Sequence, residues 1–209
     1  MQTEERKFFW EKIYSTKQQT EVSWYEEVPS ISLELIKELN LHSSARIIDN
    51  GGGDSFLVDN LLKLGFNNIT VLDISTAALE KVRKRLGKDS EKVNWVVDDD
   101  VYYHPEEQYD VWHDRAAFHF LTEDKEIKNY IKTISKCIKP GGYLIIATFS
   151  EQGPDKCSGL PVKQYSEASM TNLFQGFEKI KCFTCDHCTP SKATQNFLFC
   201  LFRKCIDQN

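Results

Sequence analysis

Three adjacent glycines follow an acid at the end of a short apolar run. The stretch ARIIDNGGGDS spans residues 45–55 and holds three of the chain's ten glycines. Glycine allows positive φ angles and close backbone approach. Asp49-x-Gly51-x-Gly53 therefore predicts a tight turn that cradles a ligand, with Ser55 close behind it.

The residues beside this turn indicate what kind of ligand it holds. A dinucleotide-binding turn carries a third glycine where this chain has Phe56. Asp54 stands where a phosphate would meet the N-terminus of the next helix. A phosphate-binding loop is excluded, because no Gly-Lys-Ser/Thr follows. We expect a ligand with a positive group and no phosphates.

Acids at the ends of the next two strands extend the same site. Asp73, followed by Ile74, lies twenty residues beyond Gly53, where an acid binds ribose hydroxyls. Asp98 and Asp99 close the third strand and can accept a hydrogen bond from an adenine amino group. A nucleoside with a cationic tail and no phosphates fits this set, and S-adenosyl-L-methionine is such a molecule.

These residues need strands and helices in alternation to bring them together. Apolar runs alternate with helical patterns from residue 45, which predicts an α/β, doubly wound, mostly parallel Rossmann-like sheet. A helix marked by Ile127, Ile131, Ile134 and Ile138 is expected to end at residues 139–142. Two β-rich runs after a Gly/Pro-rich loop predict a C-terminal antiparallel hairpin at the sheet edge. The predicted strands are 45–49, 68–75, 93–99, 109–114, 143–149, 177–185 and 196–204.

Length and composition are those of one domain. The 209 residues carry a net charge of −5, 41% hydrophobic and 27% charged residues. We expect a single domain over 1–209, with a helical cap or lid at 1–44, a cofactor-binding core at 45–150, and a substrate-side loop and hairpin at 151–209. Nucleic acid and membrane are not expected partners. The acidic N-terminus and the scattered cysteines favour a cytoplasmic protein with reduced thiols. A monomer is expected.

The combination of motifs resembles the class I S-adenosylmethionine-dependent methyltransferases. The resemblance is carried by the Asp49 turn, Asp73, Asp99, YDVWHDRAAFHFL and KPGGYLIIATF. FWEKIYSTKQQTEVSWYEEVP further resembles the branch that includes the lysine methyltransferases of elongation factor 1A and citrate synthase, together with uncharacterised bacterial proteins. This likeness implies that the N-terminal segment folds over the cofactor, with Trp24 and Tyr25 covering the methionine and ribose.

One departure from that branch bears on the substrate. The eukaryotic lysine methyltransferases carry an acid-Lys-Gly-Thr stretch after the fourth strand, whereas this chain has Asp114-Arg115-Ala116-Ala117. Only the acid carries over. The leading hypothesis is methyl transfer to a small-molecule acceptor by in-line displacement. A protein lysine methyltransferase is the alternative, and a non-catalytic cofactor-binding protein is the second alternative.

The residues after the fourth strand are the candidates for the chemistry. Asp114 would lie beside the sulfonium or the nucleophile, in both a cofactor-binding and a catalytic role. His119 would be a catalytic base or contact the acceptor, and Arg115 and Cys157 would contact the acceptor. A structural alternative is an Asp114–Arg115 ion pair that braces the loop, with His119 packed beneath it.

A cysteine cluster near the C-terminus has spacing that invites comparison with zinc sites. Cys182, Cys185 and Cys188 repeat at intervals of three, beside His187. In a strand, a spacing of three puts Cys182 and Cys185 on opposite faces. No metal site is therefore expected.

Overall fold

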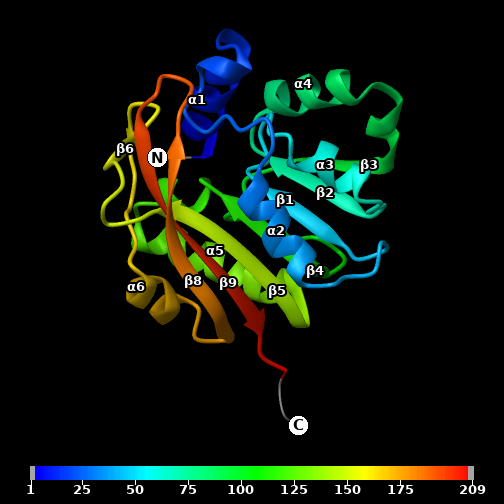
Figure 1. Cartoon of the computed structure of the whole chain (residues 1–209), viewed down its shortest axis with the longest axis vertical. Helices are drawn as coiled ribbons and strands as arrows, with labels where there is room; N and C mark the ends of the chain where they lie inside the picture. The colour runs from blue at the N-terminus through cyan, green and yellow to red at the C-terminus, as the bar shows by residue number, and fades with distance from the viewer. Residues whose placement is uncertain (1–2, 207–209) are drawn as a thin grey trace.

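The computed structural model describes residues 3–206 and shows a seven-stranded sheet in the order β3-β2-β1-β4-β5-β9-β8 (Figure 1). Strands β1 to β5 pair in parallel, β9 runs antiparallel to β5, and β8 runs antiparallel to β9. The predicted doubly wound sheet with a C-terminal hairpin is confirmed. Residues 1–2 of the expected cap and 207–209 of the terminal segment lie outside the described residues.

The strands fall close to the predicted apolar runs. A two-stranded ribbon, which the sequence did not indicate, also forms in the loop after β5. The strands are β1 Ile47–Asn50, β2 Ile69–Asp73, β3 Val93–Val97, β4 Tyr109–Arg115, β5 Ile138–Phe149, β6 Lys156–Cys157, β7 Leu160–Pro161, β8 Phe177–Cys188 and β9 Thr194–Lys204.

Helices cover both faces of the sheet. The helices α2 (Ser30–Glu38), α3 (Leu57–Lys63) and α4 (Thr76–Leu86) pack on one face, and α5 (Asp124–Cys137) and α6 (Glu167–Leu173) on the other. Helix α1 (Thr3–Thr16) lies at one end of the sheet, opposite the end where the C-terminal tail leaves (Figure 1). Short 3₁₀ turns occur at Gln19–Glu21, Gly87–Lys92 and Phe118–Phe120.

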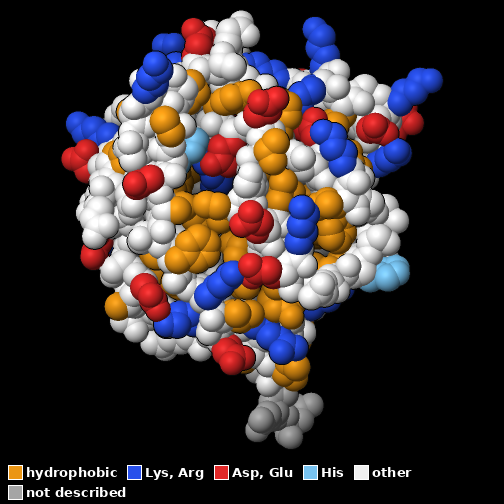
Figure 2. Space-filling view, in the orientation of Figure 1, with side chains coloured by type: hydrophobic (Ala, Val, Ile, Leu, Met, Phe, Trp, Pro, Cys, Tyr) orange, Lys and Arg blue, Asp and Glu red, His pale blue; other side chains and the backbone are white. Residues whose placement is uncertain are grey.

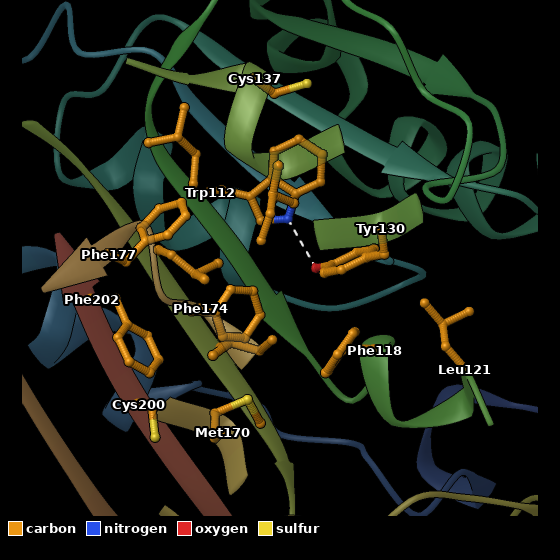
Figure 3. Packing of buried hydrophobic residues seen from close by; sticks show 14 of the residues in the cluster. Trp112, Phe118, Leu121, Tyr130, Cys137, Met170, Phe174, Phe177, Cys200 and Phe202 are labelled. Carbon is orange, nitrogen blue, oxygen red and sulfur yellow. Dashed lines mark hydrogen bonds between the residues drawn. The ribbon is translucent and has the colours of Figure 1, made fainter. Parts of the chain in front are cut away.

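Aromatic side chains dominate the core beneath α5 and α6 (Figure 3). Trp112 and Tyr130 are fully buried there, and the indole Nε1–H donates to the Tyr130 hydroxyl at 3.2 Å. Phe118 packs against Tyr130 in a tilted arrangement with ring centroids 4.8 Å apart. The segment after β4 is therefore packed, through Phe118, against the aromatic core on this face of the sheet.

The structure corrects two sequence-based predictions. Helix α5 ends at Cys137, and Ile138 begins β5 instead of closing the helix, because it pairs with Tyr109 on β4. Cys182 and Cys200 form a disulfide, which corrects the expectation of reduced thiols throughout. The antiparallel register of β8 and β9 places these two residues directly opposite each other, with Cα atoms 4.2 Å apart.

The outer surface mixes charge with apolar side chains. Figure 2 shows hydrophobic side chains gathered over the middle of one face, interspersed with acidic and basic residues. Within residues 3–206, no helix has the length and apolar character needed to cross a membrane.

Candidate functional site

A pocket opens at the carboxyl ends of the parallel strands, beneath α1 and the segment 22–29. Its floor comes from the turn after β1, the end of β2, and β4, and its roof includes Trp10 and Tyr14 of α1. This is the position where ligands bind in doubly wound sheets. Among the residues predicted for cofactor or substrate, those that line it are Trp24, Tyr25, Asp49, Gly51, Ser55, Asp73, Ile74, Asp98, Arg115 and Cys157.

The protein itself requires the three glycines of the turn. Gly51 and Gly53 have φ angles of +60° and +53°. A Cβ on Gly51 would lie 2.5 Å from the Cβ of Ala117, and one on Gly53 would overlap the Tyr14 hydroxyl. A Cβ on Gly52 would lie 2.8 Å from Asp49 Oδ2. Gly51 and Gly52 line the pocket, whereas Gly53 does not, and its cofactor-binding role stays a prediction.

Asp73 lies at the end of β2, where a ribose-binding acid was predicted. Its carboxylate accepts hydrogen bonds from the backbone N–H groups of Gly53 and Ser75, both at 2.8 Å. Burial nevertheless raises the pKa of Asp73 to about 7, since desolvation outweighs these two bonds. The carboxyl group thus closes the glycine turn and also lines the pocket.

The acids after β3 divide between two environments. Asp98 and Asp100 line the pocket. Asp99 does not, and its cofactor role stays a prediction: its carboxylate accepts from Arg6 at 3.0 Å and from Thr3 at 2.7 Å. Asp99 therefore anchors α1. The sequence offered three consecutive acids, and only the backbone path decides which ones face the pocket.

Asn50 is a pocket residue that the sequence did not single out. Its Nδ2 donates to Asp100 at 2.9 Å and to Asp114 at 2.8 Å. Its Oδ1 is buried and has no hydrogen-bond partner within the described chain. Because buried polar atoms are normally satisfied, this oxygen is suited to accept an N–H from a bound molecule.

Asp114 does not line the pocket, and its catalytic and cofactor-binding roles stay predictions. Its carboxylate is fully buried and accepts from the Tyr130 hydroxyl at 2.5 Å, from Asn50, and from the backbone N–H groups of Ala117 and Phe118. With its acceptor positions occupied, the side chain fixes the turn after β4. Burial raises the pKa of Asp114.

His119 likewise does not line the pocket, and its roles as base and acceptor contact stay predictions. Its side chain is fully buried, and Nδ1 accepts from the backbone N–H of Phe149 at 3.2 Å. Burial, with a contribution from nearby Arg115, lowers the pKa of His119 to about 3. The imidazole is therefore neutral near pH 7.

Arg115 projects into the pocket and holds the segment 22–29. Its Nη1 donates to the Trp24 carbonyl at 3.0 Å, and Nη2 lies 2.9 Å from Glu26 Oε1. The structural alternative was an ion pair between Arg115 and Asp114. In the structure Arg115 pairs with Glu26 instead. Glu26 also faces His187 at 3.2 Å. Burial alone would raise the pKa of Glu26, but His187 and Arg115 outweigh it and lower the pKa.

Cys157 lines the pocket on the same side as Arg115. Its Sγ lies 3.9 Å from the Ser23 hydroxyl. Burial raises the pKa of the Cys157 thiol, so it stays protonated near neutral pH. It can contact an acceptor but is poorly suited to act as a nucleophile.

A second set of pocket residues forms a buried hydrogen-bonded line. His113 Nδ1 lies 2.7 Å from Asp49 Oδ1, and His113 Nε2 lies 2.9 Å from Ser32 Oγ. All three side chains are at most 3% exposed and line the pocket. Asp49 was predicted from its motif. Ser32 and His113 could not be linked from sequence, since 81 residues separate them.

The roof of the pocket consists of aromatic side chains, and α1, which carries part of it, is held by Arg6 and Glu11. The Trp10 ring lies 5.8 Å from Trp24 and 4.9 Å from Phe120, measured between centroids. Arg6 of α1 binds Asp99, and Glu11 accepts from the N-terminal groups of α4 at Ser75, Thr76 and Ala77. Charged contacts of Arg6 and Glu11 therefore hold α1 in place over the pocket.

No cluster that could hold a metal ion occurs among residues 3–206. Cys182 is bonded to Cys200. Cys182 packs with the core beneath α5, whereas Cys185 packs with the core on the other face. The predicted separation of these two cysteines across the sheet is confirmed.

Comparisons with known proteins agree with this geometry. Residues 48–144 match a family model described as a methyltransferase domain. Malonyl-[acyl-carrier protein] O-methyltransferase 1 of Ilyobacter polytropus is 29% identical over 119 residues, covering 55% of this chain and 43% of that protein. EEF1A lysine methyltransferase 2 of Danio rerio is 28% identical over 159 residues, covering 68% and 67%.

A solved structure shares the fold. N-methyltransferase NodS from Bradyrhizobium japonicum, in complex with S-adenosyl-L-homocysteine, has a TM-score of 0.64 at 15% identity, covering 86% of this chain and 89% of that one. The chain covers 43% and 39% of the length of the two malonyl-[acyl-carrier protein] O-methyltransferases that it matches. In fold, in the domain match over residues 48–144 and in its relatives, the chain is similar to the class I S-adenosylmethionine-dependent methyltransferases.

The residues present fit the cofactor of that class. The free Asn50 Oδ1 is an acceptor for an ammonium or amino group. Asp73 offers a carboxylate for hydroxyl groups, and Asp98 and Asp100 offer acceptors on the neighbouring side. The turn leaves no room for a side chain at positions 51 and 52. Acids predominate among the charged residues at this end of the pocket, which suits a sulfonium better than a pyrophosphate.

Proposed function

We propose that the chain binds S-adenosyl-L-methionine and transfers its methyl group to a small-molecule acceptor. The observation that carries the proposal is the covered pocket at the carboxyl ends of β1, β2 and β4, with Asn50 Oδ1 unpartnered within it. The cofactor supplies an activated methyl group on a sulfonium. The protein has to bind it, align the acceptor and exclude water, and alignment alone can contribute roughly 7–11 kcal/mol.

The pocket divides into two sides, and this division supports separate places for the two molecules. Asp73, Asp98 and Asp100 lie at the ends of β2 and β3, on one side of the β1 turn. Arg115 ends β4 and Cys157 comes after β5, on the other side. We assign the nucleoside to the first side and the acceptor to the second, beneath Trp10, Trp24 and Phe120.

A small acceptor is favoured by the roof. Aromatic rings from α1, from the segment 22–29 and from the turn after β4 meet above the acceptor side. A flat or apolar small molecule matches such walls, because aromatic surfaces bind other rings by offset or edge contacts. The acid of the lysine methyltransferase motif, Asp114, is fully occupied inside the protein.

A protein lysine acceptor is the second candidate. It is favoured by the similarity to EEF1A lysine methyltransferase 2 of Danio rerio, which extends over two thirds of both chains. A lysine side chain would have to enter past Tyr25 and Glu26, which line the pocket and also a shallower groove beside His187.

Isotope-labelled cofactor distinguishes these candidates. The protein is first titrated calorimetrically with S-adenosyl-L-homocysteine and with NAD. It is then incubated with methyl-labelled cofactor and either cell extract or a panel of small hydroxyl, thiol and amine compounds. Label in a small product supports the proposal, and label in polypeptide supports the second candidate. Cofactor binding without transfer to either would indicate a non-catalytic binding protein, and absence of S-adenosyl-L-homocysteine binding would refute all three.

A further inference from the structure

The donor and acceptor roles along the line Ser32–His113–Asp49 follow from the Asp49 carboxylate at its end. An ionised carboxylate can only accept, so His113 Nδ1 carries the proton that Asp49 binds at 2.7 Å. Nε2 then presents a lone pair and accepts the Ser32 hydroxyl at 2.9 Å. The hydroxyl oxygen keeps its own lone pairs available to a further donor. The line can therefore take up a proton at its Ser32 end.

Ser32 is unusual for a helical serine. A serine within a helix commonly bonds the carbonyl four residues earlier, which here would be that of Val28. The hydroxyl instead bonds His113, although Ser32 lies in the first turn of α2. Its side chain is 1% exposed and lines the pocket. The hydroxyl is thus directed to the sheet edge by the position of α2.

The line lies on the acceptor side of the pocket. His113 precedes Arg115 by two residues on β4, so both point to the same face of the sheet. The charged groups that face the imidazole are Asp49 from β1, Glu26 from the segment 22–29, and Arg115 from β4. Ser32 is its neighbour from α2 and is uncharged. Glu26 and Arg115 pair with each other, and Asp49 is the carboxylate in direct contact with the imidazole, so that it would stabilise an imidazolium.

We propose that Ser32, His113 and Asp49 form a proton relay that activates the acceptor, which is a small aromatic molecule carrying a hydroxyl or thiol. This inference rests on the proposed function. Hydroxyl and thiol groups of this kind are wholly or partly protonated at neutral pH and attack poorly until they lose the proton. Histidine is the side chain best suited to accept a proton near pH 7. The aromatic roof provides the matching surface for the acceptor's ring.

The step balances as follows for an acceptor X–H. The proton on X passes to Ser32 Oγ while the Ser32 hydroxyl proton passes to His113 Nε2, giving an imidazolium held by Asp49. The lone pair on X forms the bond to the methyl carbon. The carbon–sulfur bond breaks, and its electron pair stays on sulfur as a neutral thioether. His113 returns the extra proton to water through Ser32 after the products leave.

The test compares acceptors of equal shape and different acidity. The probes are 4-methylphenol with 4-nitrophenol, and 4-methylbenzenethiol with 4-nitrobenzenethiol; the nitro compound of each pair is the more ionised at a given pH. In His113→Gln, kcat for 4-methylphenol at pH 7 should fall by about 10²- to 10⁴-fold. Transfer to the nitro compounds at pH 8 should stay close to wild type. Ser32→Ala should show the same pattern without altering the imidazole.

Matched controls separate chemistry from folding. His119→Asn replaces a buried histidine outside the pocket and keeps an oxygen for the Phe149 N–H, so its transfer ratio between the paired probes should equal the wild-type ratio. Calorimetric affinity for S-adenosyl-L-homocysteine should be retained in His113→Gln and Ser32→Ala. In ¹⁵N-histidine spectra of the wild type near pH 8, the His113 ring should be the Nδ1-protonated tautomer.

Several outcomes overturn the relay. Equal loss for both members of a pair in His113→Gln would show a positioning role only. Wild-type transfer restricted to the nitro compounds would show that no base operates. S-adenosyl-L-homocysteine binding without transfer to any of the four probes would refute the acceptor class, and an Nε2-protonated His113 would refute the donor and acceptor roles along the line. A wild type that fails to bind S-adenosyl-L-homocysteine would refute the proposed function itself.

Discussion

Asp73 is subject to two effects that act on its ionisation in opposite directions. The N–H groups of Gly53 and Ser75 favour the carboxylate, whereas burial favours the neutral acid. The net effect raises the pKa to about 7 from an ordinary value near 4. A ligand hydroxyl that reaches this carboxylate would add a hydrogen bond to the charged form. The residue is therefore positioned to gain from cofactor binding.

Without ligand, this pKa predicts a loss of stability as the pH rises. The folded state holds the Asp73 proton up to about pH 7, whereas the unfolded chain releases it near pH 4. The contribution is thus present below pH 4 and is lost between pH 4 and 7, by at most about 4 kcal/mol. Asp73→Asn should show a smaller decline of unfolding free energy over this range, measured by urea titration. Some decline should remain, because the pKa of Asp100 is also raised to about 7. An unchanged slope in Asp73→Asn would contradict the assignment.

Asp114 organises the segment after β4. Four donors converge on its carboxylate, two of them backbone N–H groups of the turn that carries Ala117 and Phe118. Asp114→Ala should lower the free energy of unfolding by about 2–4 kcal/mol, because hydrogen bonds to a buried charged group contribute about 1.5–3 kcal/mol each and the freed donors stay buried. Urea unfolding at pH 7 measures this.

Asp110 on the same strand provides the matched control. Its carboxylate accepts from Lys139 and from the Arg46 backbone, but it is partly exposed. Asp110→Ala should cost about 1 kcal/mol or less, as exposed ion pairs do. Equal losses for the two variants would show that the buried network around Asp114 adds no stability.

Helix α1 is joined to the fold by its charged residues. Glu11 accepts from Ser75 Oγ at 2.7 Å and from the N–H groups of Thr76 and Ala77 at 3.0 and 2.8 Å. A carboxylate there caps α4 from another element and meets the positive end of its dipole. Burial would raise the pKa of Glu11, but the bonds from α4 outweigh it and lower the pKa. The attachment is thus complete at neutral pH and weakens as the pH falls through that lowered value.

Removal of this cap should loosen the roof of the pocket. In Glu11→Ala, amide hydrogen exchange across residues 3–16 should accelerate by about 2- to 30-fold, which corresponds to the 0.5–2 kcal/mol value of a helix cap. Glu4→Gln removes the same charge from an exposed position of α1 and serves as control. Exchange that is equally fast in both variants would show that aromatic packing alone holds α1.

The strands were predictable because burial on both faces produces continuous apolar runs. The exact residues at which helices and strands begin and end were less predictable. Ile138 continues the helical spacing of α5 yet begins β5, and either state buries it. The disulfide could not be foreseen, since the register of β8 against β9 decides which cysteines meet.

The parts of the candidate site that belong to a local backbone motif were predictable from the sequence. The parts that depend on contacts between side chains distant in sequence were less predictable. The glycine turn and Asp73 follow from the strand-to-helix connection. Asp99 and Asp100 are adjacent acids, and the sequence does not show that Asp99 binds Arg6 of α1 while Asp100 lines the pocket. The pairing of His113 with Ser32 depends on how α2 packs against β4, which no local pattern records.

At the scale of the whole molecule, the pocket joins parts of the chain that are distant in sequence. Its walls come from α1, from the segment 22–29, and from the ends of four parallel strands, with Cys157 beyond β5. A ligand in this pocket touches most layers of the fold at once. Binding should therefore stabilise the protein as a unit, and the size of the effect depends on affinity and concentration alone.

Ligand-dependent unfolding tests this view and the choice of cofactor together. At 100 times its dissociation constant, S-adenosyl-L-homocysteine should add about 2.7 kcal/mol to the free energy of unfolding. NAD at the same concentration should add nothing, because Phe56 replaces the third glycine and the pocket acids Asp54, Asp73 and Asp98 repel a pyrophosphate. Adenosine should give a smaller effect, since it reaches the acids after β2 and β3 but not Asn50 and the roof. Thermal unfolding with the three ligands measures the order. Stabilisation by NAD equal to that by S-adenosyl-L-homocysteine would mean that the acids and Phe56 do not select the ligand, and the nucleoside side of the pocket would have to be reassigned.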